Sequence, residues 1–105
     1  MLKPDELGER FPLTEKSIEQ HAPDKPGVYA LWRKSQLICY ESDSKSLRQA
    51  LLDALYDFLS RSRHSDEFQF EVTTAARCEK RRAELIATYY EAMRRLPPAN
   101  DIRNP

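Results

Sequence analysis

The sequence has few of the residues on which several classes of site depend. It contains two glycines, two cysteines and two histidines among 105 residues. Because Gly8 and Gly27 are the only glycines, a glycine-rich phosphate loop is excluded. Cys39 and Cys78 have neither CxxC spacing nor a nearby histidine pair, which gives no zinc motif. Both cysteines are therefore predicted to be reduced thiols, buried or half-buried.

Net charge and long apolar runs are also absent. Seventeen Lys and Arg residues balance seventeen Asp and Glu residues, so the formal net charge is zero. The whole chain therefore has no general attraction to nucleic acid or to an anionic membrane surface. No apolar run approaches the roughly 20 residues that span a bilayer, and the N-terminus has no signal-peptide region. We therefore expect a cytoplasmic protein without membrane contact. The length predicts a single domain over 1–105, with a lead-in at 1–12 and a tail at 101–105.

Turn signals and strand-forming residues predict a β-hairpin in the first half of the chain. Pro26-Gly27 is a turn signal, and strand-forming residues lie on both sides of a polar break at 33–36. The hairpin carries Tyr29 on its first strand and Tyr40 on its second. The break has no Asn-Gly or Asp-Gly pair, so both a tight turn and a looser one satisfy the pattern.

Helices and a further strand surround this hairpin. Thr14 is expected to cap a helix that ends before Pro23. Apolar residues three and four apart predict a second helix over about 44–61, with its cap at position 43 or 44. Alternation over 67–73 predicts a half-buried strand, and a long helix follows from a cap at 74 to about 96. The predicted fold class is α+β, with a small three-stranded antiparallel or mixed sheet flanked by helices.

Several segments, in this order, resemble the GIY-YIG endonuclease domain. They are Gly27-Val28-Tyr29, the strand ending near Tyr40, and the segments 45–51, 82–86 and 96–100, preceded by a lead-in at 11–18. The resemblance covers nearly the whole chain and implies a three-stranded antiparallel sheet flanked by helices. In active members, tyrosines, an arginine, a glutamate and an asparagine line one concave surface. A divalent cation such as Mg²⁺ assists phosphodiester cleavage there.

The resemblance implies that part of this catalytic set is present. Tyr29, Tyr40, Glu84 and Asn100 match catalytic positions, with Glu84 as the metal ligand. The family's second tyrosine motif can be aligned with this sequence in two ways. In the first, Tyr40 is the tyrosine that begins the motif; in the second, the segment 38–40 is the motif and a longer loop follows it. Neither alignment keeps the glycine of the motif, so a side chain stands where the family brings bare backbone close to the site.

The resemblance also implies that two polar groups of the site are missing. Ala50 and Ala54 occupy the positions of the family's arginine and histidine. Because residues four apart share one helix face, both groups are lost from the same patch. Arg33, Lys45 and Arg48 are the candidate nucleic-acid-binding cations, although Arg48 is about 200° around the helix from position 50.

Three functions follow as hypotheses. The first is a degenerate, inactive GIY-YIG-like domain that needs no cofactor and binds a nucleic acid or a protein. The second is a weak Mg²⁺-dependent DNA endonuclease that uses Tyr29, Tyr40 and Glu84, with Arg33 or Arg48 as a recruited cation. The third is a small structural subunit whose strand edge and long helix mediate oligomerisation, the oligomeric state being open. The same tyrosines are also ordinary strand formers, and Glu84 also suits a solvated charge network.

Overall fold

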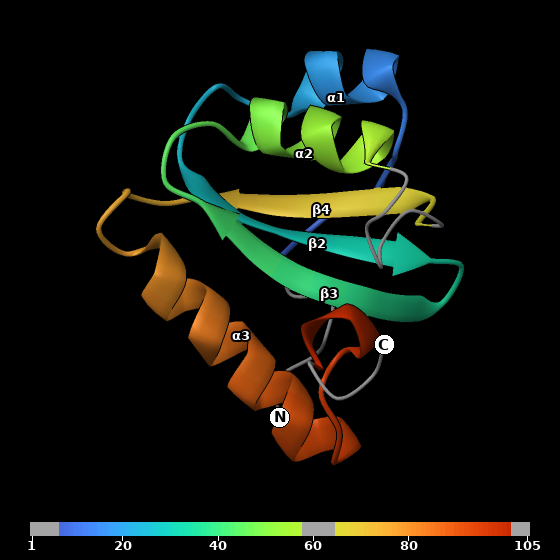
Figure 1. Ribbon diagram of the computed structural model, residues 1–105, viewed down its shortest axis with the longest axis vertical. Coiled ribbons are helices and arrows are strands. Elements are labelled where there is room, and N and C mark those ends of the chain that lie inside the picture. Colours follow the sequence, from blue (N-terminus) through green and yellow to red (C-terminus); the bar gives the residue numbers. More distant parts are fainter. Residues whose placement is uncertain (1–6, 58–64, 102–105) are drawn as a thin grey trace.

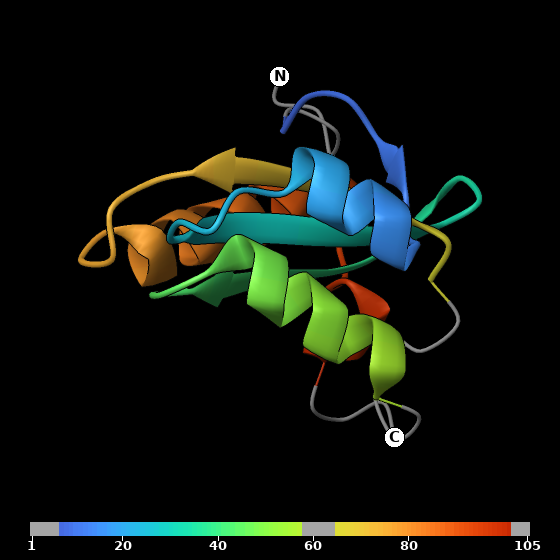
Figure 2. The same ribbon diagram turned by 90° about the horizontal axis from the view of Figure 1, so that it is seen from above.

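The fold is a four-stranded antiparallel sheet between two layers of helices. The computed structural model describes residues 7–57 and 65–101. The elements are β1 (Phe11–Pro12), α1 (Glu15–His21), β2 (Gly27–Arg33), β3 (Gln36–Asp43), α2 (Leu47–Tyr56), β4 (Glu67–Val72), α3 (Cys78–Met93) and the short 3-10 helix η1 (Pro98–Asn100). The strand order is β1-β4-β2-β3. Figures 1 and 2 show α1 and α2 on one face of the sheet and α3 on the other. The predicted α+β class is confirmed.

The fourth strand comes from the segment that was expected to be a lead-in. Phe11 and Pro12 pair with Phe68 and Glu67 at the start of β4. Leu7, further toward the N-terminus, is 8% exposed and packs into the core on the α3 side. The sheet therefore has four strands rather than three, because the end of the segment 1–12 adds an edge strand. Of the predicted tail at 101–105, positions 102–105 lie outside the described residues.

Local hydrogen bonds decide where the first two helices begin. Thr14 caps α1 as predicted, since its hydroxyl accepts a hydrogen bond from the N–H of Ser17 at 3.2 Å. α2 begins later than predicted, because the Asp43 carboxylate accepts from the N–H groups of two following residues at 2.8 and 2.7 Å. Ser46 then caps α2. The helix ends at Tyr56, and positions 58–61 of its predicted range lie outside the described residues.

The long helix is shorter than the pattern predicted. A turn over 74–77 precedes α3, so the helix begins at Cys78 rather than directly after the predicted cap at Thr74. The helix ends at Met93, where Arg94 adopts the left-handed conformation with φ 59°. In the part of the chain that the structure describes, no helix is long and apolar enough to cross a membrane.

Two apolar clusters, one on each face of the sheet, form the core. The cluster on the α3 face contains Leu7, Val28, Ala30, Trp32, Leu37, Tyr40, Cys78, Leu85 and Tyr89. The cluster on the face of α1 and α2 contains Leu13, Ile18, Ala22, Tyr29, Leu31, Cys39, Leu47, Leu51 and Phe68. Both cysteines are buried, as predicted. The two tyrosines of the hairpin belong to different clusters.

A β-bulge explains why these tyrosines separate. The hairpin has a two-residue turn at 34–35, and its ladder then shifts by one residue because Ile38 is an extra residue in β3. In a regular ladder Tyr40 would lie opposite Tyr29, whereas the bulge places it opposite Ala30. A shift of one residue moves every later side chain of the strand to the other face of the sheet.

Candidate functional site

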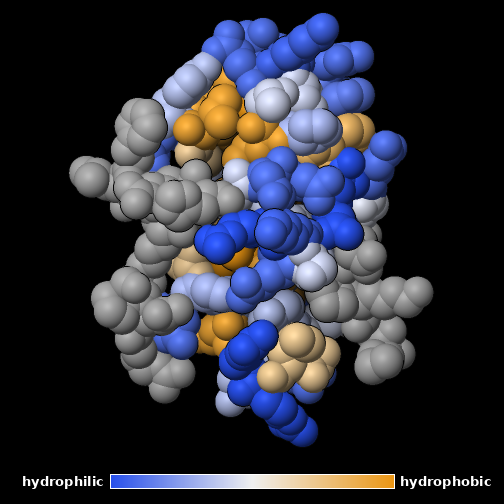
Figure 3. Space-filling view, turned by 90° about the vertical axis from the view of Figure 1, so that its right-hand side faces the viewer, coloured by the Kyte–Doolittle hydropathy of each residue, from blue (hydrophilic) through white to orange (hydrophobic). Residues whose placement is uncertain are grey.

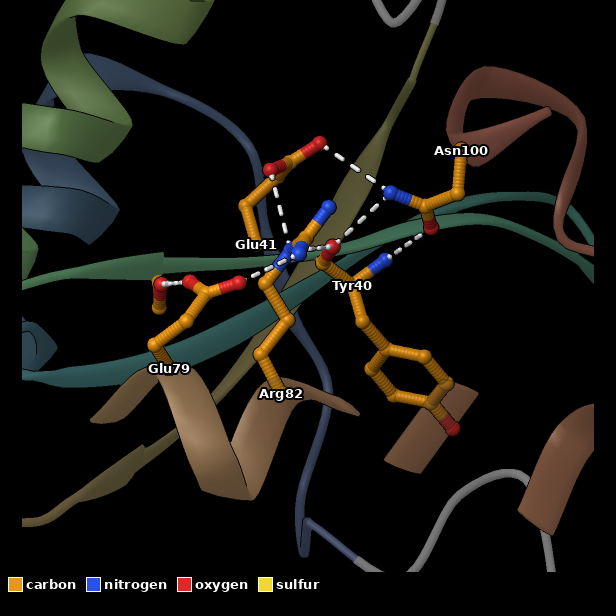
Figure 4. A network of polar contacts seen from close by, with 6 residues as sticks. Tyr40, Glu41, Glu79, Arg82 and Asn100 are labelled. Atoms are coloured by element: carbon orange, nitrogen blue, oxygen red, sulfur yellow. Dashed lines mark hydrogen bonds and ion pairs between the residues drawn. The ribbon is translucent and has the colours of Figure 1, made fainter. Parts of the chain in front are cut away.

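The structure does not bring Tyr29 and Tyr40 onto one surface. Figure 4 shows the ring of Tyr40 and the carboxylate of Glu41 leaving β3 in opposite directions. Tyr40 is 1% exposed and packs in the cluster under α3, while Tyr29 faces α2. The expectation of two convergent phenols is therefore corrected, and the physical reason is the bulge at Ile38. On the face of Tyr29, β3 presents the thiol of Cys39.

Tyr29 lines a cavity of about 340 Å³ between the sheet and α2. We call it the acidic cavity; its lining residues are Tyr29, Leu31, Glu41 and Asp43 from the sheet, and Ala50, Asp53, Ala54 and Asp57 from α2 and its C-terminal cap. The sheet residues alternate along their strands and so share one face. The α2 residues lie three and four apart and so share one helix face.

The acidic cavity concentrates negative charge around a neutral phenol. Four of its eight described lining residues are Asp or Glu, and none of these eight is Lys or Arg. Burial raises the pKa of Tyr29, and the neighbouring Cys39 thiol and three of the carboxylates raise it further. Burial likewise raises the pKa of Cys39 to about 12. Both groups therefore stay protonated at neutral pH, and neither offsets nor adds to the charge of the carboxylates.

Ala50 and Ala54 lie on the wall of the acidic cavity, on one face of α2 as expected. The cations proposed to replace the missing arginine lie elsewhere. The Nε of Arg48 donates a hydrogen bond of 2.9 Å to the carbonyl oxygen of Ala22, after the end of α1. Arg33 is the last residue of the seven-residue β2, about 20 Å from the other end of that strand.

The three candidate nucleic-acid-binding cations do not form one patch. Asp43 pairs with Gly27 at the start of β2, so Lys45 lies near that end of the sheet together with the start of α2. Arg33 lies at the opposite end, beside the hairpin turn. The predicted group of Arg33, Lys45 and Arg48 is therefore divided between two ends of the hairpin.

Asn100 pairs with the backbone of the edge strand (Figure 4). Its Oδ1 accepts a hydrogen bond of 2.8 Å from the N–H of Tyr40, and its Nδ2 donates one of 3.0 Å to the carbonyl oxygen of the same residue. The Nδ2 also donates to Glu41 at 3.3 Å. A side-chain amide thus occupies the place that the backbone of a neighbouring strand would take. Both polar atoms of the amide are engaged in holding η1 to β3.

Arg82 of α3 is shared between two carboxylates. Its Nε lies 3.5 Å from Glu41 and donates to the carbonyl oxygen of Tyr40 at 3.2 Å. Its terminal nitrogen donates to Glu79 at 2.8 Å, and Glu79 in turn accepts from the hydroxyl of Ser42. Burial raises the pKa of Glu41, although Arg82 and Asn100 oppose that shift. The charge of Arg82 is therefore not available to the interior of the acidic cavity.

Replacing Glu41 by glutamine is expected to make the stability of the domain less dependent on pH. The native pKa of Glu41 is raised above its ordinary value of 4.5, so the folded state binds the proton more tightly than the unfolded state does. That stabilisation is complete below pH 4.5 and is lost as the pH rises through the native pKa. The wild type should therefore lose stability relative to Glu41→Gln between pH 4.5 and pH 7. Urea unfolding at both pH values measures the difference, and a difference that moves in the other direction contradicts the assignment.

Glu84 lies on the other side of the sheet from Tyr29. Its side chain is 53% exposed and lies 3.8 Å from Arg81. It lines a separate cavity of about 240 Å³ together with Arg77 and Lys80, among others. Within residues 7–57 and 65–101, no three Asp, Glu, His or Cys side chains are grouped so as to hold a metal ion. The surroundings of Glu84 therefore do not fit the predicted Mg²⁺ site, because cations already surround its carboxylate.

The acidic residues of the cavity were missed by sequence reasoning, although a signal was present. Glu41 and Asp43 are two residues apart in β3, so they share a face, but both lie beyond the predicted end of that strand near Tyr40. Asp53 and Asp57 are four residues apart in the predicted helix and lie beside the alanines that attracted attention. The helical spacing therefore indicated one acidic pair, whereas the other pair depends on the observed length of β3, and the register of the hairpin brings both pairs to one cavity.

Among known proteins, the similarities of this chain lie with solved structures. No protein-family model matches it, and no curated protein matches it. Among solved structures, it is similar to the GIY-YIG N-terminal endonuclease domain of UvrC from Thermotoga maritima, seen in two point mutants bound to the catalytic divalent cation. The sequence identities are 24% and 23%, the TM-score is 0.58 for both, and the match covers 72% of this chain and 92% of that domain. The chain therefore has a GIY-YIG-like fold.

Proposed function

We propose that this GIY-YIG-like domain does not cleave phosphodiesters and instead acts as a binding module for a protein partner. The observation that carries the proposal is the composition of the acidic cavity. Where the resemblance implies an arginine beside Tyr29, the cavity has Ala50, and four of its eight described lining residues are Asp or Glu, of which Glu41 is paired with Arg82 of α3. The proposal is the first of the three sequence hypotheses, restricted to a protein partner.

Electrostatics argue against phosphoryl transfer in this cavity. The reaction places negative charge on the phosphoryl oxygens, and enzymes stabilise that charge with metal ions and with arginine or lysine side chains. Carboxylates around a partly buried site repel a phosphodiester instead, because like charges at short range raise the free energy of the bound state. The neutral phenol of Tyr29 offers no charge to offset this repulsion.

The main cations of α3 support a protein partner over a nucleic acid. Arg81 donates to the carboxylate of Glu71 at 2.8 and 3.1 Å, and Arg82 is paired with Glu79 and Glu41. Cations held in intramolecular ion pairs have to exchange partners before they neutralise phosphates. The favourable term that usually drives binding to nucleic acid is thereby reduced.

The third hypothesis, assembly through the edge strand, finds less support. β3 is an edge of the sheet, and Asn100 covers part of that edge by pairing with the backbone of Tyr40. Covered edges are protected from pairing with another chain. The face in Figure 3 is also largely hydrophilic, with hydrophobic surface in separate patches. These features favour contact through the acidic cavity over edge-to-edge assembly.

A nicking assay tests the absence of cleavage. Plasmid DNA and a branched DNA substrate are incubated with the protein and Mg²⁺ or Mn²⁺, and no cleavage above the protein-free control is expected. Tyr29→Phe and Glu84→Ala are assayed beside the wild type, because the resemblance assigns catalytic roles to both residues. Metal-dependent cleavage that disappears in either variant overturns the proposal and supports the second hypothesis.

A further inference from the structure

The outer edge of β4, which is the edge away from β2, is free over the second half of the strand. β1 is only two residues long and pairs with Glu67 and Phe68, so it covers the start of β4 and no more. In Figure 2, β1 lies beside the start of β4, and no strand of the described residues lies beside the arrowhead. The last residues of β4, up to Val72, therefore face an edge without a neighbouring strand.

The register determines which backbone groups point outward at this edge. In an antiparallel ladder, alternate residues direct both of their backbone groups toward the same neighbouring strand. The N–H of Thr73 donates to the carbonyl oxygen of Pro26 at 3.1 Å, so Thr73 and Glu71 bond toward β2. Phe70 and Val72 then direct their N–H and C=O groups to the outer edge. In the part of the chain that the structure describes, none of these groups has a hydrogen-bond partner there.

The N-terminal segment of the chain leaves this edge instead of following it. A strand that continued back from Phe11 would bring residues 8–10 alongside the second half of β4. The carbonyl oxygen of Gly8 instead accepts a hydrogen bond from the side chain of Gln69, and Leu7 packs in the cluster on the α3 face. Gly8 has a positive φ of 98°, which suits a change of chain direction. The place of a further strand beside β4 is thereby left open.

The side chains along this edge are apolar on the face of α1. Phe70 packs against the cluster on that face, and its ring centroid lies 6.2 Å from that of Phe11. Val72, two residues further along the strand, shares the face and is 46% exposed. An added strand would place its own alternate side chains beside Phe70 and Val72, where apolar side chains pack best.

We propose that the outer edge of β4 binds an extended segment of a protein partner as an added strand, in line with β1 and with apolar side chains at alternate positions. Unpaired N–H and C=O groups at strand spacing are complementary to another extended backbone. The inference rests on the proposed function and deepens it, because it gives the conformation in which the partner binds. The surface is separate from the acidic cavity, which lies between the sheet and α2, and adds a second place of contact.

A partner segment suits this edge better than a second copy of the chain does. Two copies would use all of their free groups only by pairing Phe70 of one with Val72 of the other, because β1 already pairs with Phe68. Glu71 would then lie directly opposite Glu71 of the second copy, and like charges at opposed positions destabilise a strand pair. The ion pair of each Glu71 with Arg81 offsets part of this repulsion. A segment with a neutral residue at that position has no repulsion to offset.

The test is an NMR titration of the whole chain with a capped peptide of sequence Ser-Val-Thr-Val-Ser. Its valines match Phe70 and Val72, and we expect saturable shifts of the backbone amides of these two residues with an affinity on the order of 1 mM. N-methylation of both valines removes the peptide N–H groups that bond to β4, and should weaken binding by about tenfold or more. N-methylation of the central threonine removes an N–H that points away from β4, and should change affinity by less than about threefold.

Val72→Pro is the matching variant of the protein. Proline lacks the N–H that points outward at this position, and the ladder between β2 and β4 loses no hydrogen bond because the N–H of Val72 is not part of it. The peptide should bind about fivefold more weakly. Val72→Thr keeps the N–H and a β-branched side chain, and should change affinity by less than about threefold. The N-methylated peptides test the same pairing on the wild-type chain if Val72→Pro does not fold.

Each outcome decides the inference. Binding that depends on alternate N–H groups of the peptide and on the N–H of Val72 supports an added strand. Absence of saturable shifts at Phe70 and Val72 overturns the inference, as do equal binding of all three peptides and undiminished binding by Val72→Pro.

Analytical ultracentrifugation addresses the other occupant. A concentration-dependent dimer that Val72→Pro abolishes overturns the inference, because a second copy then fills the edge. A negative nicking assay still stands in each of these cases. DNA cleavage, in contrast, contradicts the proposed function whatever the peptides do.

Discussion

Replacing Gly27 with alanine is expected to lower the free energy of unfolding by about 3 kcal/mol, the upper end of the range for overpacking a close contact. A Cβ at this position would lie 2.3 Å from the carbonyl oxygen of Glu71 in β4 and 2.7 Å from Cδ1 of Leu47 in α2. The first of these atoms is backbone and cannot turn away as a side chain does. Strand β4 and the start of α2 must therefore both move to admit one methyl group.

Urea unfolding of Gly27→Ala measures this effect, and Gly8→Ala is the comparison. A Cβ added at Gly8 would have no atom within 4 Å among the described residues, and the φ of +98° is the source of strain there. Its replacement should lower stability by about 1 kcal/mol. If Gly27→Ala is no more destabilising than Gly8→Ala, the close approach of β2, β4 and α2 is not as tight as described.

Replacing Asn100 with aspartate is expected to destabilise the domain by about 2–3 kcal/mol at neutral pH. The change removes the donor that bonds to the carbonyl oxygen of Tyr40 and to Glu41, at 3.0 and 3.3 Å. It also places a second carboxylate beside Glu41, and two like charges at this distance repel. η1 should then detach from the edge of β3 before the rest of the domain unfolds.

Asn100→Ala is the matched control, because it removes both hydrogen bonds to Tyr40 without adding charge. We expect it to cost about 1–2 kcal/mol. Thermal unfolding at pH 7 and at pH 4 separates the two effects, since protonation of the new carboxyl removes its repulsion at the lower pH. Equal stabilities of the aspartate variant and the wild type at pH 7 would show that the amide does not hold η1 in place.

The order of the elements was predictable because each one carries its own local pattern. Thr14 caps α1, alternation identifies β4, and apolar spacing identifies α2, all within short segments of chain. Fold class follows from the order of such segments. The additional edge strand was not predictable, because β1 has two residues and exists only through its pairing with β4.

The candidate site was less predictable, because one residue of register decides it. The turn at 34–35 fixes where the hairpin begins, but the extra residue Ile38 determines which face the following side chains occupy. Apolar and polar residues alternate in the same way whichever face of the sheet the apolar ones occupy. The alternation therefore does not reveal a one-residue shift such as the bulge at Ile38. The pairing of Asn100 with Tyr40, which are 60 residues apart, has no local signal either.

The likeness to an endonuclease domain concerns the sheet and its helices, and the site differs from what that likeness implies. The phenols of Tyr29 and Tyr40 lie on opposite faces of the sheet, and carboxylates surround Tyr29. Glu84 lines a separate cavity together with Arg77 and Lys80, among others. One fold supports unrelated functions when its site residues differ. The charge of the cavity therefore carries more weight for function than the topology does.

The proposed exclusion of phosphodiesters from the acidic cavity is tested most directly by an NMR titration with a short DNA duplex in the presence of Mg²⁺. The amides of Tyr29, Glu41 and Asp53 report on the cavity from β2, β3 and α2. No saturable shifts are expected at these amides, because the carboxylates repel the phosphates. Saturable shifts centred on Tyr29 would contradict the account, since they would place a phosphodiester in a cavity whose charge should exclude one.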